Sequence, residues 1–458
     1  TSTMTNNIPR RWRDLWERPW VAPLLAGAIT ATLCAITLQT DINGSNHPYA
    51  TDVGELQNAL PRWGTIHFSG YPLYSISGSL IVTLLRAVGV PPAAGASLVS
   101  LLWGAATAIL LALLALELGA TRPTAVTGAV VFAVSTSMWI DSSLAEVHSM
   151  TMALIAAILL FAVRFDKSGD RRDLIWLTVA LSQGIFHGRS VIGLAPAVLL
   201  LVLPRWRTIL RNLPLLIGIS LIAPLLYVYM PLREWMGSDW TFGNTSTWQG
   251  FWRMFLNIKA ARFASAAKRA TGWLERLQVT AQALDDDLLL VLQGLGLTGL
   301  FTVRRPSKLD TWRYGAALVL AWLPYAAVPL IIYAGFVGDA ILAVKMPVSL
   351  CAGLGLALLI SRLHDWRPAA GHAALGLAAA GIIFSGWRNY PEVIAITRNQ
   401  GIEAVIATAD QAANPDQPTT LMVLWGHDYW GIAYAQQYRS QIGGGSRWSI
   451  IMRPLARS

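Results

Sequence analysis

Charged residues are scarce in this chain of 458 residues. Asp, Glu, Lys and Arg make up 13% of the sequence, whereas an ordinary soluble protein carries roughly 25%. Hydrophobic residues make up 54%, and several apolar runs approach the roughly 20 residues that a helix needs to cross a membrane. The scarcity of charge therefore excludes an ordinary soluble domain and predicts an all-α polytopic membrane protein.

Cysteine and the motifs of soluble catalysis are also missing. The two cysteines, Cys34 and Cys351, both lie in apolar segments, which excludes a disulfide framework or a cysteine metal centre. The sequence contains no Gly-Lys-Ser/Thr phosphate loop, no His-Glu-x-x-His and no Gly-x-Ser-x-Gly, so a nucleotide-hydrolysing pump is disfavoured. No basic, aromatic nucleic-acid module is present, so we expect no nucleic acid partner. The net charge of +10 suits contact with anionic lipid or phosphate, although basic topology signals supply much of it.

The basic clusters predict the topology. Residues 1–19 form an arginine-rich arm that we place in the cytoplasm, and residues 20–386 form the transmembrane domain. Residues 73–89 are read as an interfacial or re-entrant helix, because a crossing there would move every later basic cluster to the opposite side. About eleven spans are then expected in an inner (plasma) membrane, at residues 20–38, 93–118, 122–140, 147–165, 173–187, 190–203, 212–230, 285–302, 314–335, 339–361 and 369–386.

Three segments are expected outside the cell. They are a first loop with interfacial helices (39–92), a second large loop (231–284) and a C-terminal tail (387–458). The tail is less apolar, and the run Leu-Met-Val-Leu-Trp-Gly before His427 is typical of a buried strand that ends in a loop. The tail is therefore predicted to be a small extracytoplasmic α/β subdomain.

Unusual polar residues are concentrated in the first loop. Asp52 and Glu55 are three residues apart, and His67 precedes the turn Gly70-Tyr71-Pro72. Carboxylates beside a membrane core cost free energy to keep, so they are candidate functional groups. The alternative is a helix cap, with Asp52 as N-cap and Glu55 in the first turn.

Further candidates are expected towards the outer side, in the loop between the third and fourth spans, at the tip of the hairpin 173–203, in the second large loop and, for Lys345, inside an apolar span near its outer end. Cations there can hold a lipid phosphate, a carboxylate can take a proton from a hydroxyl, and aromatic rings can cover a lipid or a sugar face. Capping and snorkelling remain open for most of these side chains. Asp285-Asp286-Asp287 is expected to open the eighth span as a helix N-terminus. The candidates are Asp141, Glu146, His148, His187, Arg189, Arg233, Trp240 and Lys345.

Taken together, these motifs resemble the GT-C superfamily of polytopic glycosyltransferases. The bacterial branch related to the eukaryotic transmembrane O-mannosyltransferases of plexin-type receptors is the most similar. It pairs an acidic D-x-x-E-like motif after the first span with an H-P-P-G-Y-P-L-Y-like segment. Here these read Asp52-Val53-Gly54-Glu55 and His67-Phe68-Ser69-Gly70-Tyr71-Pro72-Leu73-Tyr74. Further matches are Ala145-Glu146-Val147-His148, Tyr229-Met230-Pro231-Leu232-Arg233 and the loop with Trp240, Gly243, Asn244 and Phe251.

The resemblance covers about residues 20–260, and it departs from the pattern at Phe68-Ser69 and at His148. It implies transfer of a sugar from a polyprenyl-phosphate donor to a protein hydroxyl, a lipid or a glycan on the outer face. Asp52 would be the general base, Glu55 a supporting carboxylate, and His67 and Tyr71 part of the same pocket. The leaving phosphate would need fixed cations, for which we select Arg189, Arg233 and, from its position alone, Lys345.

Three questions stay open at this point. The resemblance leaves the need for a divalent metal ion undecided, because some relatives use one and others do not. A lipid or solute transporter is an alternative, as is a noncatalytic scaffold or complex subunit with an enzyme-like fold.

Overall fold

The fold is described by a computed structural model, which covers residues 14, 16–256, 272–303, 308–331, 339–412, 420–424, 426–439 and 449–453. Most of the arm 1–19 and parts of the expected second loop and tail lie outside these residues. Nearly every described element is a helix, and the described strands form one two-stranded sheet.

The first half of the chain contains the longest buried helices. Its elements are α2 (Val21–Ile36), η1 (Pro48–Ala50), α3 (Val53–Ala59), η2 (Leu60–Arg62), α4 (Pro72–Ala87), α5 (Pro92–Glu117), α6 (Arg122–Ala133), α7 (Thr136–Ser143), α8 (His148–Ser168), α9 (Arg171–His187), η3 (Arg189–Leu194), α10 (Ala195–Val202), η4 (Leu203–Arg205), α11 (Trp206–Arg211), α12 (Leu213–Ser220), α13 (Ile222–Leu225), η5 (Leu226–Val228) and α14 (Tyr229–Trp235).

The second half completes the bundle and adds the tail. Its elements are α15 (Trp248–Phe255), α17 (Trp273–Asp287), α18 (Leu290–Leu300), α19 (Lys308–Ile331), α20 (Asp339–Trp366), α21 (Pro368–Thr397), α22 (Gly401–Ala412), β1 (Thr420–Leu424), α23 (His427–Tyr438) and β2 (Ser449–Arg453). Strands β1 and β2 pair in parallel, and α23 lies between them in the sequence. The strand expected before His427 is therefore present as β1.

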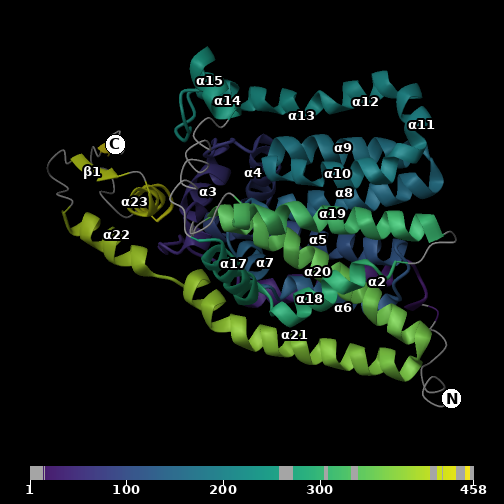
Figure 1. Cartoon of the computed structure of the whole chain (residues 1–458). Coiled ribbons are helices and arrows are strands. Elements are labelled where there is room, and N and C mark those ends of the chain that lie inside the picture. The colour runs from purple at the N-terminus through teal and green to yellow at the C-terminus, as the bar shows by residue number, and fades with distance from the viewer. Residues whose placement is uncertain are drawn as a thin grey trace.

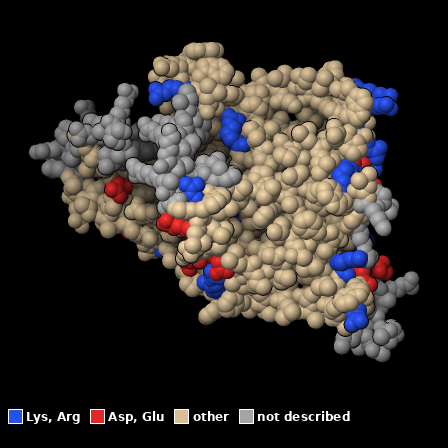
Figure 2. Space-filling view, in the orientation of Figure 1, with Lys and Arg blue, Asp and Glu red and all other residues tan. Residues whose placement is uncertain are grey.

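The length and composition of the helices support a polytopic membrane protein. Among the described residues six helices are long and apolar enough to cross a membrane, or seven if the bent pair α6 and α7 forms one span. This is fewer than the eleven expected, because several expected spans are short or broken helices. Helix α4 is one of the shorter apolar helices. Figure 2 shows charged residues towards two ends of the molecule, with a wide face between them that is almost free of charge.

The largest core cluster lies among α5, α8, α10, α19 and α20. A second cluster packs the first loop against the bundle, with Leu56, Leu60 and Tyr74 fully buried. In Figure 1, helices α3 and α4 lie near α23 and β1 at one end of the bundle, and α21 runs along its side. The first loop and the tail therefore meet at one end of the membrane domain.

The acidic run Asp285-Asp286-Asp287 is placed differently from our expectation. It ends α17 and does not begin a span. Three acids at a helix C-terminus oppose the helix dipole, so they need compensation. Asp285 and Asp286 each lie 3.4 Å from Arg388. Asp287 is fully buried and accepts hydrogen bonds from the Ser137 N–H (2.7 Å) and the Ser349 hydroxyl (2.6 Å). The run is therefore a structural link between α17, α7 and α20.

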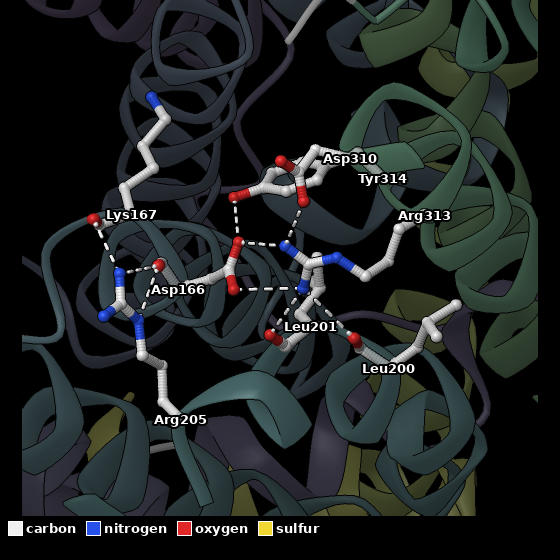
Figure 3. Close-up of polar contacts among 8 residues, drawn as sticks. All are labelled: Asp166, Lys167, Leu200, Leu201, Arg205, Asp310, Arg313 and Tyr314. Atoms are coloured by element: carbon white, nitrogen blue, oxygen red, sulfur yellow. Dashed lines mark hydrogen bonds and ion pairs between the residues drawn. The ribbon is translucent and has the colours of Figure 1, made fainter. Parts of the chain in front are cut away.

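A second buried carboxylate, that of Asp166, links three helices near the C-terminal end of α8 (Figure 3). Asp166 accepts hydrogen bonds from Arg313 at 3.0 and 2.7 Å and from the Tyr314 hydroxyl. Arg313 also donates to the carbonyls of Leu200 and Leu201. At 1.5 Å per residue, Asp166 lies roughly 27 Å along α8 from His148, which is close to the thickness of a bilayer core.

We expect Asp166→Ala to lower the free energy of unfolding by about 3–5 kcal/mol, because it leaves the Arg313 guanidinium without its buried partner. Asp310→Ala is the matched control. Asp310 also contacts Arg313, at 3.2 Å, but its side chain is 45% exposed, so its loss should cost less than about 1 kcal/mol. Thermal unfolding can be followed with a thiol-reactive dye, since Cys34 and Cys351 are buried. Equal effects of the two substitutions would contradict this account of the cluster.

Candidate active site

The first polar group lies at the start of α3, where His67 contacts two carboxylates. His67 Nδ1 lies 2.9 Å from Glu55 Oε2, and His67 Nε2 lies 3.4 Å from Asp52 Oδ2. Asp52 is the N-cap residue of α3, but its side chain makes no capping hydrogen bond. Its backbone carbonyl accepts from the N–H groups of Glu55 and Leu56 instead. Asp52 therefore caps α3 with its backbone only, and its carboxylate is not used for capping.

The two carboxylates have different surroundings. Glu55 is fully buried, and its Oε1 atom has no hydrogen-bond partner among the described residues. Burial raises the pKa of Glu55 above its ordinary value, and the charge and hydrogen bond of His67 act in the opposite direction. The Asp52 side chain is 29% exposed. The Asp52 carboxylate can therefore contact a substrate, while the buried Glu55 carboxyl group holds the His67 ring by a hydrogen bond.

A short, unusual turn shapes the wall of this site. Gly70 has φ 86°, and a Cβ atom there would lie 2.2 Å from the sulfur of Met230. Tyr71 also adopts the left-handed region, with φ 40°, which a non-glycine residue seldom does. The turn directs the Tyr71 ring between two imidazoles, with ring centroids 5.6 Å from His67 and 5.2 Å from His187. Tyr71 thus joins residues from α9 and the first loop.

A second polar group follows from the broken span α6–α7. Asp141 Oδ2 accepts from the Ser149 N–H at 2.6 Å, so this carboxylate caps the start of α8. The Glu146 backbone is fixed by Ser100, which accepts from its N–H and donates to its carbonyl. His187 Nε2–H donates to the carbonyl of Val147 at 3.0 Å. This hydrogen bond and Tyr71 connect the two polar groups.

Either group has the composition of a divalent-cation site. Asp52, Glu55 and His67 each offer a ligand atom within 4.8 Å of the others, and Asp141, Glu146 and His148 do the same. Carboxylate oxygens and an imidazole nitrogen are a usual donor set for such ions. The orphaned Oε1 of Glu55 adds a free oxygen to the first group. These residues therefore fit a metal ion by their chemistry.

The two expected arginine cations are held by backbone carbonyl groups. Arg189 donates to the carbonyls of Ile185 (3.0 Å) and Phe255 (2.8 Å), and its guanidinium lies over the Phe186 ring at 5.3 Å. Phe255 is the last residue of α15, so Arg189 ties this helix to the end of α9. Arg189 is thus a fixed cation against an aromatic wall, two residues from His187.

The remaining expected site residues lie in separate groups. Arg233 donates to the carbonyls of Trp63 (2.6 Å) and Arg62 (3.2 Å). The buried Trp240 ring lies 4.9 Å from the Arg62 guanidinium carbon. Lys345 donates to the Tyr49 hydroxyl at 3.1 Å, next to the loop that leads into Asp52. The structure brings Asp52, Glu55, His67, Tyr71 and His187 together, with Glu146 and His148 adjoining, but connects Arg233, Trp240 and Lys345 through other residues.

Helix α23 of the tail packs directly on α3. A Cβ atom on Gly54 would lie 3.0 Å from Trp430 Cβ. The Asn58 amide donates to the carbonyl of Trp430 at 3.0 Å, and Arg62 donates to that of Ala433 at 3.2 Å. Sequence reasoning left this helix without a role, because the contact joins positions 372 residues apart. The aromatic segment Trp425-Gly-His-Asp-Tyr-Trp after β1 was the available signal.

The chain is similar in sequence to one named family. Residues 52–210 match the model of the protein O-mannosyl-transferase TMEM260 N-terminal domain. The mouse (Mus musculus) protein O-mannosyl-transferase TMEM260 is 26% identical over 371 residues, which cover 76% of this chain. The chain spans about half, 51%, of the length of that relative.

Two solved structures share the fold of this chain. ArnT from Cupriavidus metallidurans, bound to undecaprenyl phosphate, aligns with a TM-score of 0.61 at 11% identity, covering 98% of this chain and 87% of that one. The Archaeoglobus fulgidus oligosaccharyltransferase in complex with Zn and sulfate aligns with a TM-score of 0.51 at 14% identity, covering 93% of this chain and 62% of that one. The chain therefore has the GT-C fold and is similar in sequence to the protein O-mannosyl-transferase TMEM260.

Proposed function

We propose that the chain is a membrane glycosyltransferase that moves a sugar from a polyprenyl-phosphate donor to an acceptor hydroxyl on the extracytoplasmic face. The observation that carries this proposal is the partly exposed carboxylate of Asp52, backed by His67 and the buried Glu55. This group begins the region that matches the O-mannosyl-transferase domain. The mouse relative favours a protein hydroxyl as acceptor, and the undecaprenyl phosphate bound to ArnT favours a polyprenyl carrier.

The proposed reaction is a displacement at the anomeric carbon of the sugar. The acceptor oxygen forms a bond to this carbon while the bond between the carbon and the phosphate oxygen breaks, and its electron pair leaves with polyprenyl phosphate. Asp52 takes the proton from the attacking hydroxyl. Glu55 and His67 hold the Asp52 carboxylate in place, so that little reorganisation is needed when the hydroxyl arrives.

The donor is proposed to lie between the two polar groups and the aromatic wall. Arg189 is fixed beside Phe186 and Phe255, with an apolar cluster of Tyr227, Met230 and Met254 next to it. A cation on an apolar wall suits a phosphate attached to an isoprenoid chain. Arg233 and Lys345 remain candidates for the same charge. A divalent ion at Asp52, Glu55 and His67 would serve the same purpose, because it neutralises charge on a leaving phosphate.

Two alternatives are less well supported by the arrangement. A transporter needs a polar path through the bundle, yet among the described residues the groups with metal-ligand chemistry lie near the first loop. At the far end of α8, Asp166 is engaged by Arg313 and Tyr314. A noncatalytic scaffold with this fold would not need the Asp52 carboxylate, and the first experiment below tests that.

We expect Asp52→Asn to reduce sugar transfer by about 10²- to 10⁴-fold, because an amide cannot take the proton. Transfer of a labelled sugar, mannose first, from a polyprenyl-phosphate donor to Ser/Thr-containing protein acceptors measures this. Asp365→Asn, an exposed acid at the end of α20, is the control and should keep full activity. Retained activity in Asp52→Asn, with an unchanged unfolding temperature, would remove Asp52 from the mechanism.

The pKa of Glu55 predicts the pH dependence of stability. Since burial raises its pKa in the folded state, the stability that Glu55 contributes is complete below the unfolded pKa and is lost as pH rises through the raised one. Glu55→Gln should therefore gain unfolding temperature relative to wild type as the pH rises from about 5 to about 8, a range that lies above the ordinary Glu pKa of about 4.3. The exposed Asp428→Asn variant controls for the loss of a charge. A constant difference across this range would show that the pKa of Glu55 is not raised in the folded protein.

Bound lipid tests the donor site directly. We expect native mass spectrometry of gently purified protein to find a polyprenyl-phosphate sugar, and Arg189→Ala to lose it because the phosphate loses its fixed cation. Arg253→Ala is the matched control, since Arg253 is an exposed arginine on the neighbouring helix α15. Equal occupancy in both variants would place the phosphate elsewhere, and Arg233→Ala and Lys345→Ala are then compared in the same way.

A further inference from the structure

The contacts between α3 and α23 set the relative direction of the two helices. Gly54 and Asn58 of α3 contact Trp430, and Arg62, which follows α3, contacts Ala433. Residue numbers therefore increase in the same direction along both helices. The helices are parallel, and their N-termini lie at the same end of the contact.

His427 is the first residue of α23 and comes three residues before Trp430. Residues three apart lie on the same face of a helix, and here the two rings make an edge contact with centroids 5.4 Å apart. The Trp430 side chain faces Gly54, so His427 extends this face by one turn towards the start of α3. The residue at that start is Asp52.

Two further observations agree with a position of the imidazole towards this carboxylate. Burial lowers the pKa of His427, while the negative charges of Asp52 and Asp428 act in the opposite direction. The Nδ1 atom of His427 is shielded from solvent and has no hydrogen-bond partner among the described residues. A buried ring nitrogen without a partner usually requires an explanation, and the charge from α3 that acts on this ring is that of Asp52.

Helix α23 is also held from its other side. The Tyr429 ring stacks on Trp240 at 5.6 Å with an interplanar angle of 25°. Arg62 contacts both Trp240 and the carbonyl of Ala433. The first turn of α23 is therefore fixed between the first loop and the segment that follows α14, and the backbone of His427 is held in a defined place.

We infer that His427 is a positioning residue, supplied by the C-terminal tail, that orients the Asp52 carboxylate together with His67. A hydrogen bond from the His427 imidazole N–H to Asp52 would occupy one lone pair of the carboxylate. Another lone pair would stay free to take the proton from the hydroxyl of the substrate. The side chain acts through Asp52 and not on the sugar itself. The inference rests on the proposed function, since it assigns a role within the same transfer.

Kinetics of substituted proteins test this role. His427→Ala should reduce kcat by about 10- to 100-fold while the KM values for donor and acceptor change little, because a misplaced general base slows the chemical step. His427→Gln should recover a large part of the rate, since its amide can still donate. Asp428→Ala, an exposed residue on the same turn, should keep wild-type kcat. Equal losses in the alanine and glutamine variants, or losses confined to KM or to unfolding temperature, would overturn the positioning role.

A cross-link tests the placement without relying on activity. In Asp52→Cys/His427→Cys, a short bifunctional thiol reagent should join the two residues and shift the mobility of the intact chain. The native Cys34 and Cys351 are buried and should not compete. The pair Asp52→Cys/Asp428→Cys is the control, because Asp428 is exposed on another face. Failure of the first pair to cross-link would overturn the juxtaposition.

The two proposals fail in different ways. If Asp52→Asn is inactive and His427→Ala retains wild-type kcat, the role of His427 is wrong and the proposed function stands. If Asp52→Asn keeps full activity, the general-base mechanism is wrong, and the role of His427 falls with it even when the cross-link forms.

Discussion

The contact of His67 with Asp52 and Glu55 is the interaction on which the rest of the site depends. A carboxylate without water needs either a proton or a cationic partner. Glu55 is fully buried, and the imidazole of His67 lies 2.9 Å from its carboxyl group. The same imidazole reaches Asp52 with its other nitrogen. The geometry of the exposed carboxylate is thus determined by a group inside the protein, and the surrounding loops must keep that group in place.

Several elements serve this purpose. The turn at Gly70 and Tyr71 places an aromatic ring against His67 and connects it to His187 at the end of α9. The break between α6 and α7, fixed by the buried Asp287, brings Asp141 and Glu146 close to the same end of the bundle. Buried polar groups that are fully bonded make an arrangement rigid. Asp166 and Asp287 belong to such bonded sets and are purely structural, whereas Oε1 of Glu55 has no hydrogen-bond partner among the described residues.

The sequence predicts the membrane class, most helical segments, the strand before His427 and the relation to the GT-C glycosyltransferases. These properties follow from local composition and from motifs such as Asp52-x-x-Glu55. It does not predict helix breaks or pairings between distant segments. Asp285-Asp286-Asp287 has the composition of a helix start, yet it ends α17 because Ser137, Ser349 and Arg388 bind its carboxylates. The aromatic segment around Trp430 is visible in the sequence, but its packing on Gly54 is not, because the two positions are far apart in the chain.

The contact between α3 and α23 has a consequence for the order in which the protein is made. Asn58 and Trp430 are separated by 372 residues. At a synthesis rate of about 5–20 residues per second, the ribosome needs roughly 20–75 s to make that stretch. During this interval α3 is present with its Gly54 face uncovered and without the helix that later packs on it. The nascent chain therefore acquires its membrane helices first, and the contact that completes the candidate site forms among the last.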